Sequence, residues 1–295
     1  MRNGSQPTTA RRMRRRLFTG AHGQAIVADV VGRGAPVVLA HGGGQTRTAW
    51  ARTATALMQA GHQAIAIDMR GHGESEWSPS GAYTFDDFAA DLLAISAQLP
   101  EKPALVGASL GGLAGLIAEG ELQPGAFASL SLVDITPHME ASGVAHILGF
   151  MRAYLADGFA SPDEAADAIA AYLPHRERRD RSATLSRYLR RGDDGRFRWH
   201  WDPRFVTSVT QGDAGQTTER LMAASTHLRL PVHLIRGGSS NLVSEGAAQQ
   251  FLRLAPHAVY TDVAGAGHMV AGDRNDAFTE AVVTFIKARN TADEG

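Results

Sequence analysis

Short apolar runs alternate along the chain with longer stretches of helical periodicity, and Gly, Pro or polar residues mark the junctions. Apolar runs without a polar face are typical of strands that helices cover on both sides. The predicted strands are Arg14–Thr19, Ala25–Val31, Val37–Ala40, Ala64–Ile67, Ala104–Val106, Leu130–Val133, Val232–Ile235 and Ala258–Val263. This alternation favours an α/β fold around a mostly parallel sheet.

Helices are predicted between these strands, over Thr48–Ala60, Thr84–Leu99, Leu110–Leu122, Ser244–Leu254 and Arg274–Arg289. Thr84 is a candidate N-cap, because its side-chain oxygen can accept from a free amide of the first turn. Asp86 and Asp87 follow it, where the positive end of a helix favours acidic side chains.

The pattern changes between residues 137 and 226, which contain helical stretches but no convincing buried strand. Ser161-Pro162-Asp163-Glu164 marks one helix start, with a capping box and a Pro at the first helical position. The charged run at 175–181 is interpreted as a solvated face, with an anion-binding role as the alternative. We predict a helical cap over residues 137–226, inserted into a core formed by 14–136 and 227–295.

Composition narrows the classes of function. The chain has 295 residues, 44% of them apolar, which is enough for one large core. Its 29 basic and 30 acidic residues give a formal net charge of -1, so no overall field would attract nucleic acid or an anionic membrane. A small-molecule substrate is the simpler expectation. The absence of cysteine excludes disulfides, thiolate metal sites and a cysteine nucleophile, and it fits a cytoplasmic protein.

Residues 1–13 are expected to form a flexible basic arm that leads into the first strand. No apolar stretch follows its basic cluster, so we expect no secretory signal. The longest uncharged run, Pro103–Ala118, is too short and too rich in Gly for a membrane span. Nothing in the pattern indicates a particular oligomeric state.

Gly107-Ala108-Ser109-Leu110-Gly111 follows a predicted strand and opens a predicted helix. That is the setting in which G-x-S-x-G forms a nucleophile elbow, with Ser109 as the nucleophile. Glycine is expected at 107 and 111, because side chains there would collide with neighbouring backbone in so tight a turn. The amide of Leu110, at the start of the helix, would stabilise an oxyanion. The alternative is a Gly-rich turn with an incidental serine.

His41-Gly42-Gly43-Gly44 directly follows the strand Val37–Ala40. In a hydrolase this loop supplies the second oxyanion N–H. Gly43 is the candidate donor, since a residue without a side chain lets the substrate carbonyl approach its amide, and Gly42 is expected to contact substrate beside it. Gly-rich loops after strands also bind phosphates, but no complete phosphate-binding pattern accompanies this one.

His268 lies in a small-residue loop just beyond the last predicted strand and before the last predicted helix. From there it can reach over the carboxyl edge of the sheet to Ser109. His41 is expected to brace its own loop, and His72 to lie in a turn. Neither has metal-ligand spacing and H-E-x-x-H is absent, so no metal and no cofactor is expected.

These segments together resemble the α/β-hydrolase superfamily, over residues from about 14 to 289. Arg70-Gly71-His72-Gly73-Glu74-Ser75 resembles the R-G-x-G-x-S turn of the branch with small esterases, haloperoxidase-like perhydrolases, epoxide hydrolases and C–C hydrolases. Leu132-Val133-Asp134 resembles the strand after the elbow. The resemblance implies an α/β-hydrolase fold: a mostly parallel eight-stranded sheet, helices on both faces and an inserted helical cap. A serine at the elbow, where epoxide hydrolases carry Asp, implies attack on an acyl carbonyl.

The position of the triad acid departs from the family pattern. The family acid usually ends a segment such as R-G-x-x-S-D, whereas this chain reads Arg236-Gly237-Gly238-Ser239-Ser240-Asn241. An Asn cannot stabilise an imidazolium by charge. Three interpretations stay open: Asp134 supplies the acid, the chain is a variant made inactive, or it is a natural protein of low activity. Asp134 could instead cap the backbone ahead of Pro137.

The sequence therefore predicts a serine hydrolase that cleaves a carboxylic ester or lactone through an acyl-enzyme, with His268 as the base. A perhydrolase or acyltransferase would use the same acyl-enzyme, and a ligand-binding homologue would keep the pocket with a disabled triad. We expect the cap to set substrate choice. Phe197, Trp199 and Trp201 are candidate pocket-lining aromatics, and packing of the cap onto the core is the alternative role.

Overall fold

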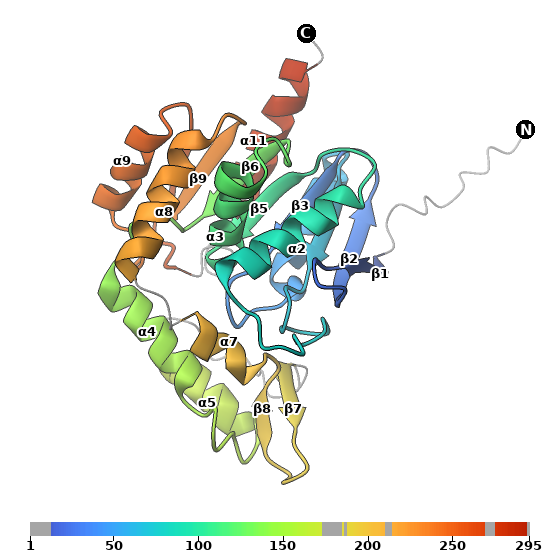
Figure 1. The fold of residues 1–295 in the computed structure, drawn as a ribbon, viewed down its shortest axis with the longest axis vertical. Coiled ribbons are helices and arrows are strands. Elements are labelled where there is room, and N and C mark those ends of the chain that lie inside the picture. Colours follow the sequence, from blue (N-terminus) through green and yellow to red (C-terminus); the bar gives the residue numbers. More distant parts are fainter. Residues whose placement is uncertain (1–12, 173–184, 186–187, 210–213, 269–274, 294–295) are drawn as a thin grey trace, which may run out of the picture.

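A computed structural model describes residues 13–172, 185, 188–209, 214–268 and 275–293 (Figure 1). Residues 1–12 of the predicted basic arm lie outside the described residues, and so does the charged run at 175–181.

Eight strands form one sheet in the order β1-β2-β4-β3-β5-β6-β9-β10. Their bounds are β1 Arg14–Thr19, β2 Ala25–Gly32, β3 Pro36–Ala40, β4 Gln63–Ile67, β5 Ala104–Ala108, β6 Ser129–Val133, β9 Val232–Gly237 and β10 Val259–Val263. Only the pairs β1–β2 and β2–β4 are antiparallel. The mostly parallel eight-stranded sheet is therefore confirmed, and each predicted strand has a counterpart within two residues at either end.

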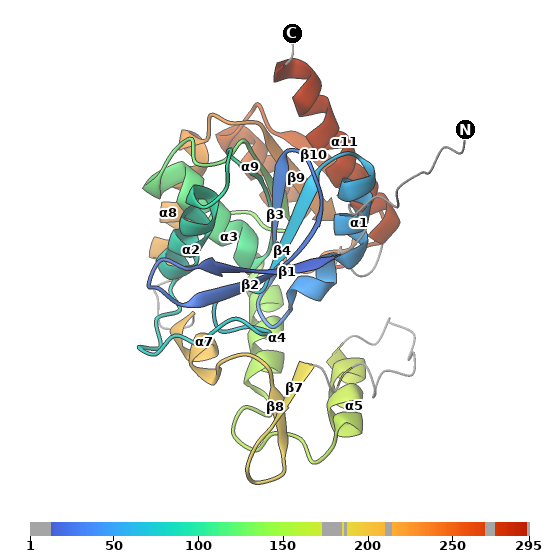
Figure 2. The same cartoon turned by 90° about the vertical axis from the view of Figure 1, so that its right-hand side faces the viewer.

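Helices cover both faces of the sheet (Figure 2). On one face lie α1 (Ala51–Gln59) and α11 (Asn275–Asp293), and on the other α2 (Phe85–Ala97), α3 (Leu110–Ile117), α8 (Ala214–His227) and α9 (Glu245–Leu254). Successive residues of a strand point to opposite faces. In β3, Val38 accordingly joins the cluster under α2 and α3, whereas Val37 and Leu39 join the cluster under α1 and α11.

The local signals for helix starts are present in the structure. Thr84 Oγ1 accepts from the Asp87 amide, and the Asp87 carboxylate accepts from the Thr84 amide at 2.8 Å, which makes a capping box. Two predicted helices are composite. A 3₁₀ turn at Arg47–Trp50 precedes α1, and a π turn at Ala118–Leu122 follows α3.

The segment between β6 and β9 contains α4 (Ala141–Arg152), α5 (Pro162–Tyr172), α7 (Pro203–Ser208) and a hairpin of β7 (Leu189–Arg191) with β8 (Phe197–Trp199). The sequence pattern indicated no convincing buried strand here and gave no sign of β7 and β8, which pair antiparallel and are mostly exposed or half-buried. Figure 1 shows these elements beyond one end of the sheet. Helix α8, at the end of the predicted cap range, packs on α3 and α9 instead. The boundary of a separate cap domain stays a prediction.

Within the described ranges, no helix is both long enough and apolar enough to cross a membrane.

Candidate active site

Ser109 lies at a sharp turn between β5 and α3, with φ 46° and ψ -113°. A positive φ is strained for a residue with a side chain, so the surrounding packing must hold it. A Cβ at Gly107 would lie 2.4 Å from the Gly111 oxygen, and a Cβ at Gly111 would lie 2.5 Å from the Ala40 oxygen. Only glycine fits at both positions, as the sequence pattern predicts, and the turn sets Ser109 at the carboxyl end of the sheet.

The predicted oxyanion donors, Gly43 and Leu110, belong to the two segments that meet at Ser109. Leu110 is the first residue of α3, where amides lack a partner within the helix. The glycine loop approaches closely, since a Cβ at Gly42 would lie 3.2 Å from Ser109 Cβ. Among the described residues, neither the Gly43 amide nor the Leu110 amide has a hydrogen-bond partner. Both N–H groups can therefore serve a ligand.

His41 braces the glycine loop from behind. The Met69 amide donates to His41 Nε2 at 3.0 Å, so the proton is on Nδ1, which donates to the Gly42 carbonyl at 2.8 Å. Burial lowers the pKa of His41 to about 3 and keeps the ring neutral. His72 is buried beside it, with ring centroids 5.2 Å apart.

His268 and Asp134, 134 residues apart in the chain, meet at the carboxyl end of the sheet. His268 Nδ1 lies 2.7 Å from Asp134 Oδ2. His268 belongs to the loop after β10, and Asp134 is the first residue after β6, with no exposed surface and a φ of 49°. The structure thus places a carboxylate on the imidazole from the position proposed as the alternative acid.

Asn241, at the usual acid position, is solvent-exposed, and its side-chain amide makes no hydrogen bond to any residue that the structure describes. Its loop nevertheless contributes to the site. The Gly237 amide donates to Asp134 Oδ1 at 2.9 Å, and the Ser240 hydroxyl donates to Asp134 Oδ2 at 2.6 Å. The sequence did not predict these two donors, because only their proximity to Asp134 in the folded chain identifies them. The Asp134 side chain is engaged here and not in capping the backbone before Pro137.

Apolar side chains from the segment after β6 cover the glycine loop. A Cβ at Gly43 would lie 3.1 Å from Phe205, and one at Gly44 would lie 3.3 Å from Trp201 and 3.4 Å from Met151. Sequence reasoning missed Phe205 and Met151, which lie in no motif. Of the predicted pocket-lining aromatics, Trp201 therefore lies against the glycine loop.

Trp199 stacks on Trp201 at 4.9 Å, but it also contacts Phe150 and Phe159 in the interior of the inserted segment. Phe197 is half-buried and pairs with Phe159 through a β-bridge. The contacts of these two aromatics match the packing role.

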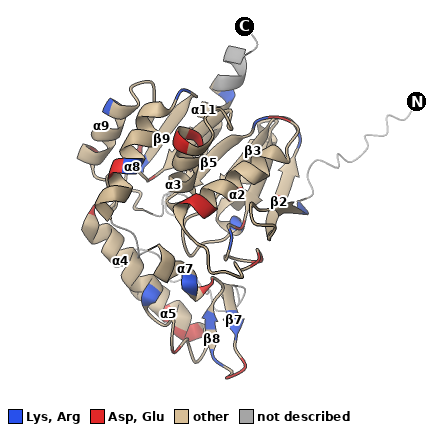
Figure 3. Ribbon diagram, in the orientation of Figure 1, with Lys and Arg blue, Asp and Glu red and all other residues tan. Residues whose placement is uncertain are grey.

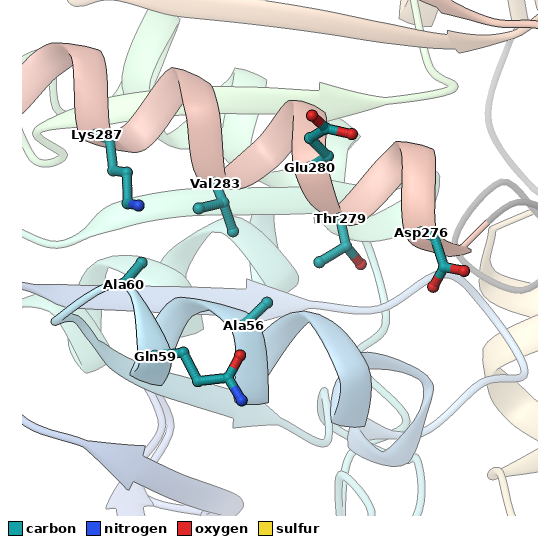
Figure 4. Close-up of a pocket in the computed structure, with 8 residues that line it drawn as sticks. All are labelled: Ala56, Gln59, Ala60, Asp276, Thr279, Glu280, Val283 and Lys287. Carbon is teal, nitrogen blue, oxygen red and sulfur yellow. The ribbon is translucent and has the colours of Figure 1, made fainter.

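Along the ribbon of the described residues, basic and acidic positions are interspersed (Figure 3). A groove of about 380 Å³ lies between α1 and α11, with Asp276, Glu280 and Lys287 along it (Figure 4). It contains none of the predicted site residues. Within the described parts of the chain, no group of three or more His, Asp or Glu side chains is arranged to hold a metal ion.

A model of the alpha/beta hydrolase fold family matches residues 35–274. The chain belongs to the α/β-hydrolase family. The esterase Rv0045c of Mycobacterium tuberculosis is 31% identical to this α/β hydrolase over 278 residues, which cover 90% of this chain and 87% of the relative. The 2-(acetamidomethylene)succinate hydrolase of Mesorhizobium japonicum is 29% identical over 228 residues, or 76% of this chain and 78% of the relative.

Solved structures agree with this assignment. A crystal structure of E-2-(acetamidomethylene)succinate hydrolase matches this α/β hydrolase with a TM-score of 0.79 and 24% identity, over 94% of this chain and 100% of the other. A structure of the M. tuberculosis esterase Rv0045c matches with a TM-score of 0.75 and 29% identity, over 95% of this chain and 93% of the other. The first of these likenesses concerns the fold alone.

Proposed function

We propose that this α/β hydrolase is a serine hydrolase that cleaves an ester-like bond through an acyl-enzyme. The observation that carries the proposal is the contact of Asp134 with His268, at the same end of the sheet as the strained Ser109 turn. Relatives named esterases, Rv0045c and YbfF of Escherichia coli, support ester hydrolysis.

Acylation would begin with proton transfer from Ser109. Asp134 accepts from Nδ1–H of His268, which leaves Nε2 unprotonated and able to take the Ser109 proton. Ser109 Oγ then attacks the substrate carbonyl carbon, and the negative oxygen of the tetrahedral intermediate accepts from the Gly43 and Leu110 amides. The buried Asp134 carboxylate stabilises the imidazolium that forms.

Collapse of this intermediate would complete acylation: the ester C–O bond breaks, and Nε2 of His268 returns the proton to the leaving alkoxide. Deacylation would use the same groups with water as the nucleophile. The imidazole then takes a proton from water, whose oxygen attacks the acyl carbon. The second intermediate releases the carboxylic acid and restores the Ser109 hydroxyl.

The position of Asp134 weighs against a disabled triad. A carboxylate contacts the imidazole, and two further donors, Gly237 and Ser240, hold it in place. An Asn at 241 removes nothing from this arrangement, because its side chain is exposed. A ligand-binding homologue with a lost acid therefore has less support than an active enzyme.

We propose an uncharged, apolar acyl group for the substrate. The side chains over the glycine loop, Met151, Trp201 and Phe205, are apolar. Among the arginines of the surrounding segments, carboxylates neutralise three: Arg47 pairs with Asp29 and Asp68, Arg70 with Asp91, and Arg204 with Asp202. A dicarboxylate substrate would need cations that are not already paired.

Labelling with a fluorophosphonate tests the nucleophile. Mass spectrometry of the Ser109 peptide should show the adduct in the native chain and not in Ser109→Ala. Absence of the adduct in the native chain would end the serine-hydrolase proposal. With p-nitrophenyl esters, kcat/KM for the butyrate should exceed that for the hemisuccinate by at least about tenfold, since only the latter buries an unpaired charge. Product analysis with an alcohol or peroxide acceptor separates hydrolysis from acyl transfer and perhydrolysis.

A further inference from the structure

His200, between β8 and α7, uses both ring nitrogens to join two loops of the core. The Gly73 amide donates to Nδ1 at 2.8 Å, so the proton is on Nε2, which faces the Gly44 carbonyl at 3.3 Å. The residue is only 4% exposed. Burial, followed by the neighbouring His72, lowers the pKa of His200 to about 3, so the ring is neutral at ordinary assay pH. One ring nitrogen must accept and the other must donate, and a neutral imidazole does both.

The Gly44 carbonyl lies on one side of Gly43, and the Gly42 carbonyl lies on the other. The Gly42 carbonyl accepts from His41 Nδ1 at 2.8 Å and from the Gln45 amide at 3.1 Å. A trans peptide unit is planar, so the Gly42 carbonyl and the Gly43 N–H point in opposite directions. The hydrogen bonds on the Gly42 carbonyl therefore set the direction of the Gly43 N–H, and the contact of His200 with the Gly44 carbonyl holds the backbone of the loop one residue further along. His41 belongs to the loop itself, but His200 belongs to the inserted segment.

The residues next to His200 anchor the inserted segment to the core. The Asp202 amide donates to the Gly71 carbonyl at 2.9 Å, and the Tyr83 hydroxyl donates to Asp202 Oδ2 at 2.6 Å. The Phe205 ring packs edge-on against His72, with centroids 4.8 Å apart. The position of the His200 ring thus depends on how this segment rests on the core.

We propose that His200 is a positioning residue: through it, the seated inserted segment holds the Gly42–Gly44 loop so that the Gly43 N–H faces the oxyanion. The proposal rests on the serine-hydrolase function above. It assigns to this segment a part in transition-state stabilisation, in addition to any contact with the substrate.

Two variants of similar volume separate hydrogen bonding from packing. His200→Gln keeps a donor and an acceptor at the end of an unbranched side chain, and His200→Met keeps the volume alone. For each variant, kcat and KM are measured with p-nitrophenyl butyrate. Inhibition constants are measured for a trifluoromethyl ketone, which forms an oxyanion with Ser109, and for the corresponding alcohol, which does not.

His200→Met should lower kcat by about tenfold or more, since loss of one oxyanion donor costs a factor on the order of 100 to 1,000. KM should stay within about threefold. In His200→Met, the affinity for the ketone should fall in the same proportion as kcat/KM, while the affinity for the alcohol should not change. His200→Gln should retain most of kcat/KM and most of the affinity for the ketone. Phe159→Leu, inside the inserted segment and away from the loop, should lower thermal stability without changing the ketone-to-alcohol ratio.

Equal behaviour of His200→Gln and His200→Met would overturn the proposal. So would an equal loss of affinity for the ketone and the alcohol, because that result indicates a general packing role. If the native chain takes no fluorophosphonate at Ser109, the serine-hydrolase function fails as well. If the native chain is labelled and the two variants behave alike, only the role of His200 fails.

Discussion

Asp134 receives three donors, and one of them is the imidazole of His268. Asp134→Asn would keep the shape of the side chain but remove the charge, and an NH2 group could face the Nδ1–H. We expect kcat to fall by about 1,000- to 10,000-fold with little change in KM. Ester hydrolysis in a stopped or continuous assay measures this loss.

Asn241→Asp is the matched control for that variant. The side chain at 241 is exposed, so the added carboxylate should change kcat by less than about threefold, in line with other surface substitutions. The assignment of Asp134 as the acid would be wrong if Asn241→Asp raised kcat by orders of magnitude or if Asp134→Asn stayed active.

Ser240 offers a finer test of the same contact. Its hydroxyl donates to Asp134 and accepts from the amides of Leu242 and Val243. Ser240→Ala removes a hydrogen bond to a charged group, so we expect kcat to fall by about tenfold. Ser239→Ala, at the exposed neighbour whose side chain makes no hydrogen bond to a described residue, should leave kcat unchanged. Equal activity of the two variants would show that the Ser240 hydroxyl does not matter to catalysis.

At the scale of elements, the approach of α3 to β3 limits what can be substituted. A Cβ at Gly111 would lie 2.5 Å from the Ala40 carbonyl oxygen, which belongs to backbone that cannot rotate away. Gly111→Ala should therefore lower the free energy of unfolding by about 2–4 kcal/mol, as measured by urea denaturation. Gly149→Ala, in α4 with no atom near its Cβ position, should raise it by about 0.5–1 kcal/mol. Similar values for the two variants would contradict this reading of the α3–β3 contact.

Element prediction succeeded where burial leaves a pattern in the sequence. β3 is buried along its whole length, so it reads as a continuous apolar run, whereas two serines interrupt the equally buried β6. β7 and β8 have three residues each and form a separate two-stranded sheet. Three residues are too few for a period of two to be recognised, so the hairpin was missed.

The residues of the candidate site also divide into those with a local sequence pattern and those without one. Ser109, Gly43 and His268 lie in short contiguous motifs whose setting can be read along the chain. The approach of Ser240 to Asp134, and that of His200 to Gly44, join residues more than 100 positions apart. Such pairs depend on tertiary packing, which no local pattern encodes.

At the scale of the whole molecule, buried neutral histidines make stability depend on pH. Burial lowers the pKa of His41, His72 and His200 to about 3 each, compared with 6.5 for an unperturbed histidine. Below about pH 6.5 the unfolded chain binds protons that the folded chain does not, so stability is complete above that pH and falls as pH decreases toward 3. Each histidine should contribute a slope of up to about 1.4 kcal/mol per pH unit.

Thermal unfolding between pH 7.5 and 5 should therefore show a falling Tm. Carboxylates with lowered pKa values, such as Asp86 and Asp202, act only at more acidic pH, since their unfolded pKa is near 4. His72→Gln should lower the slope of unfolding free energy against pH by the contribution of one histidine between pH 7.5 and 5. An unchanged slope would mean that His72 is protonated in the folded state.

The fixed carboxylate at the start of the inserted segment also bears on how such enzymes diversify. Asp134 is held by groups from β9 and its loop and from His268, whereas α4 begins only at Ala141. The residues from His138 to Glu140, exposed or half-buried, separate the two. A graft that joins foreign chain there would exchange the inserted segment while Asp134 and its three donors stay in place, and on the proposal above a transplanted segment would need its own counterpart of His200.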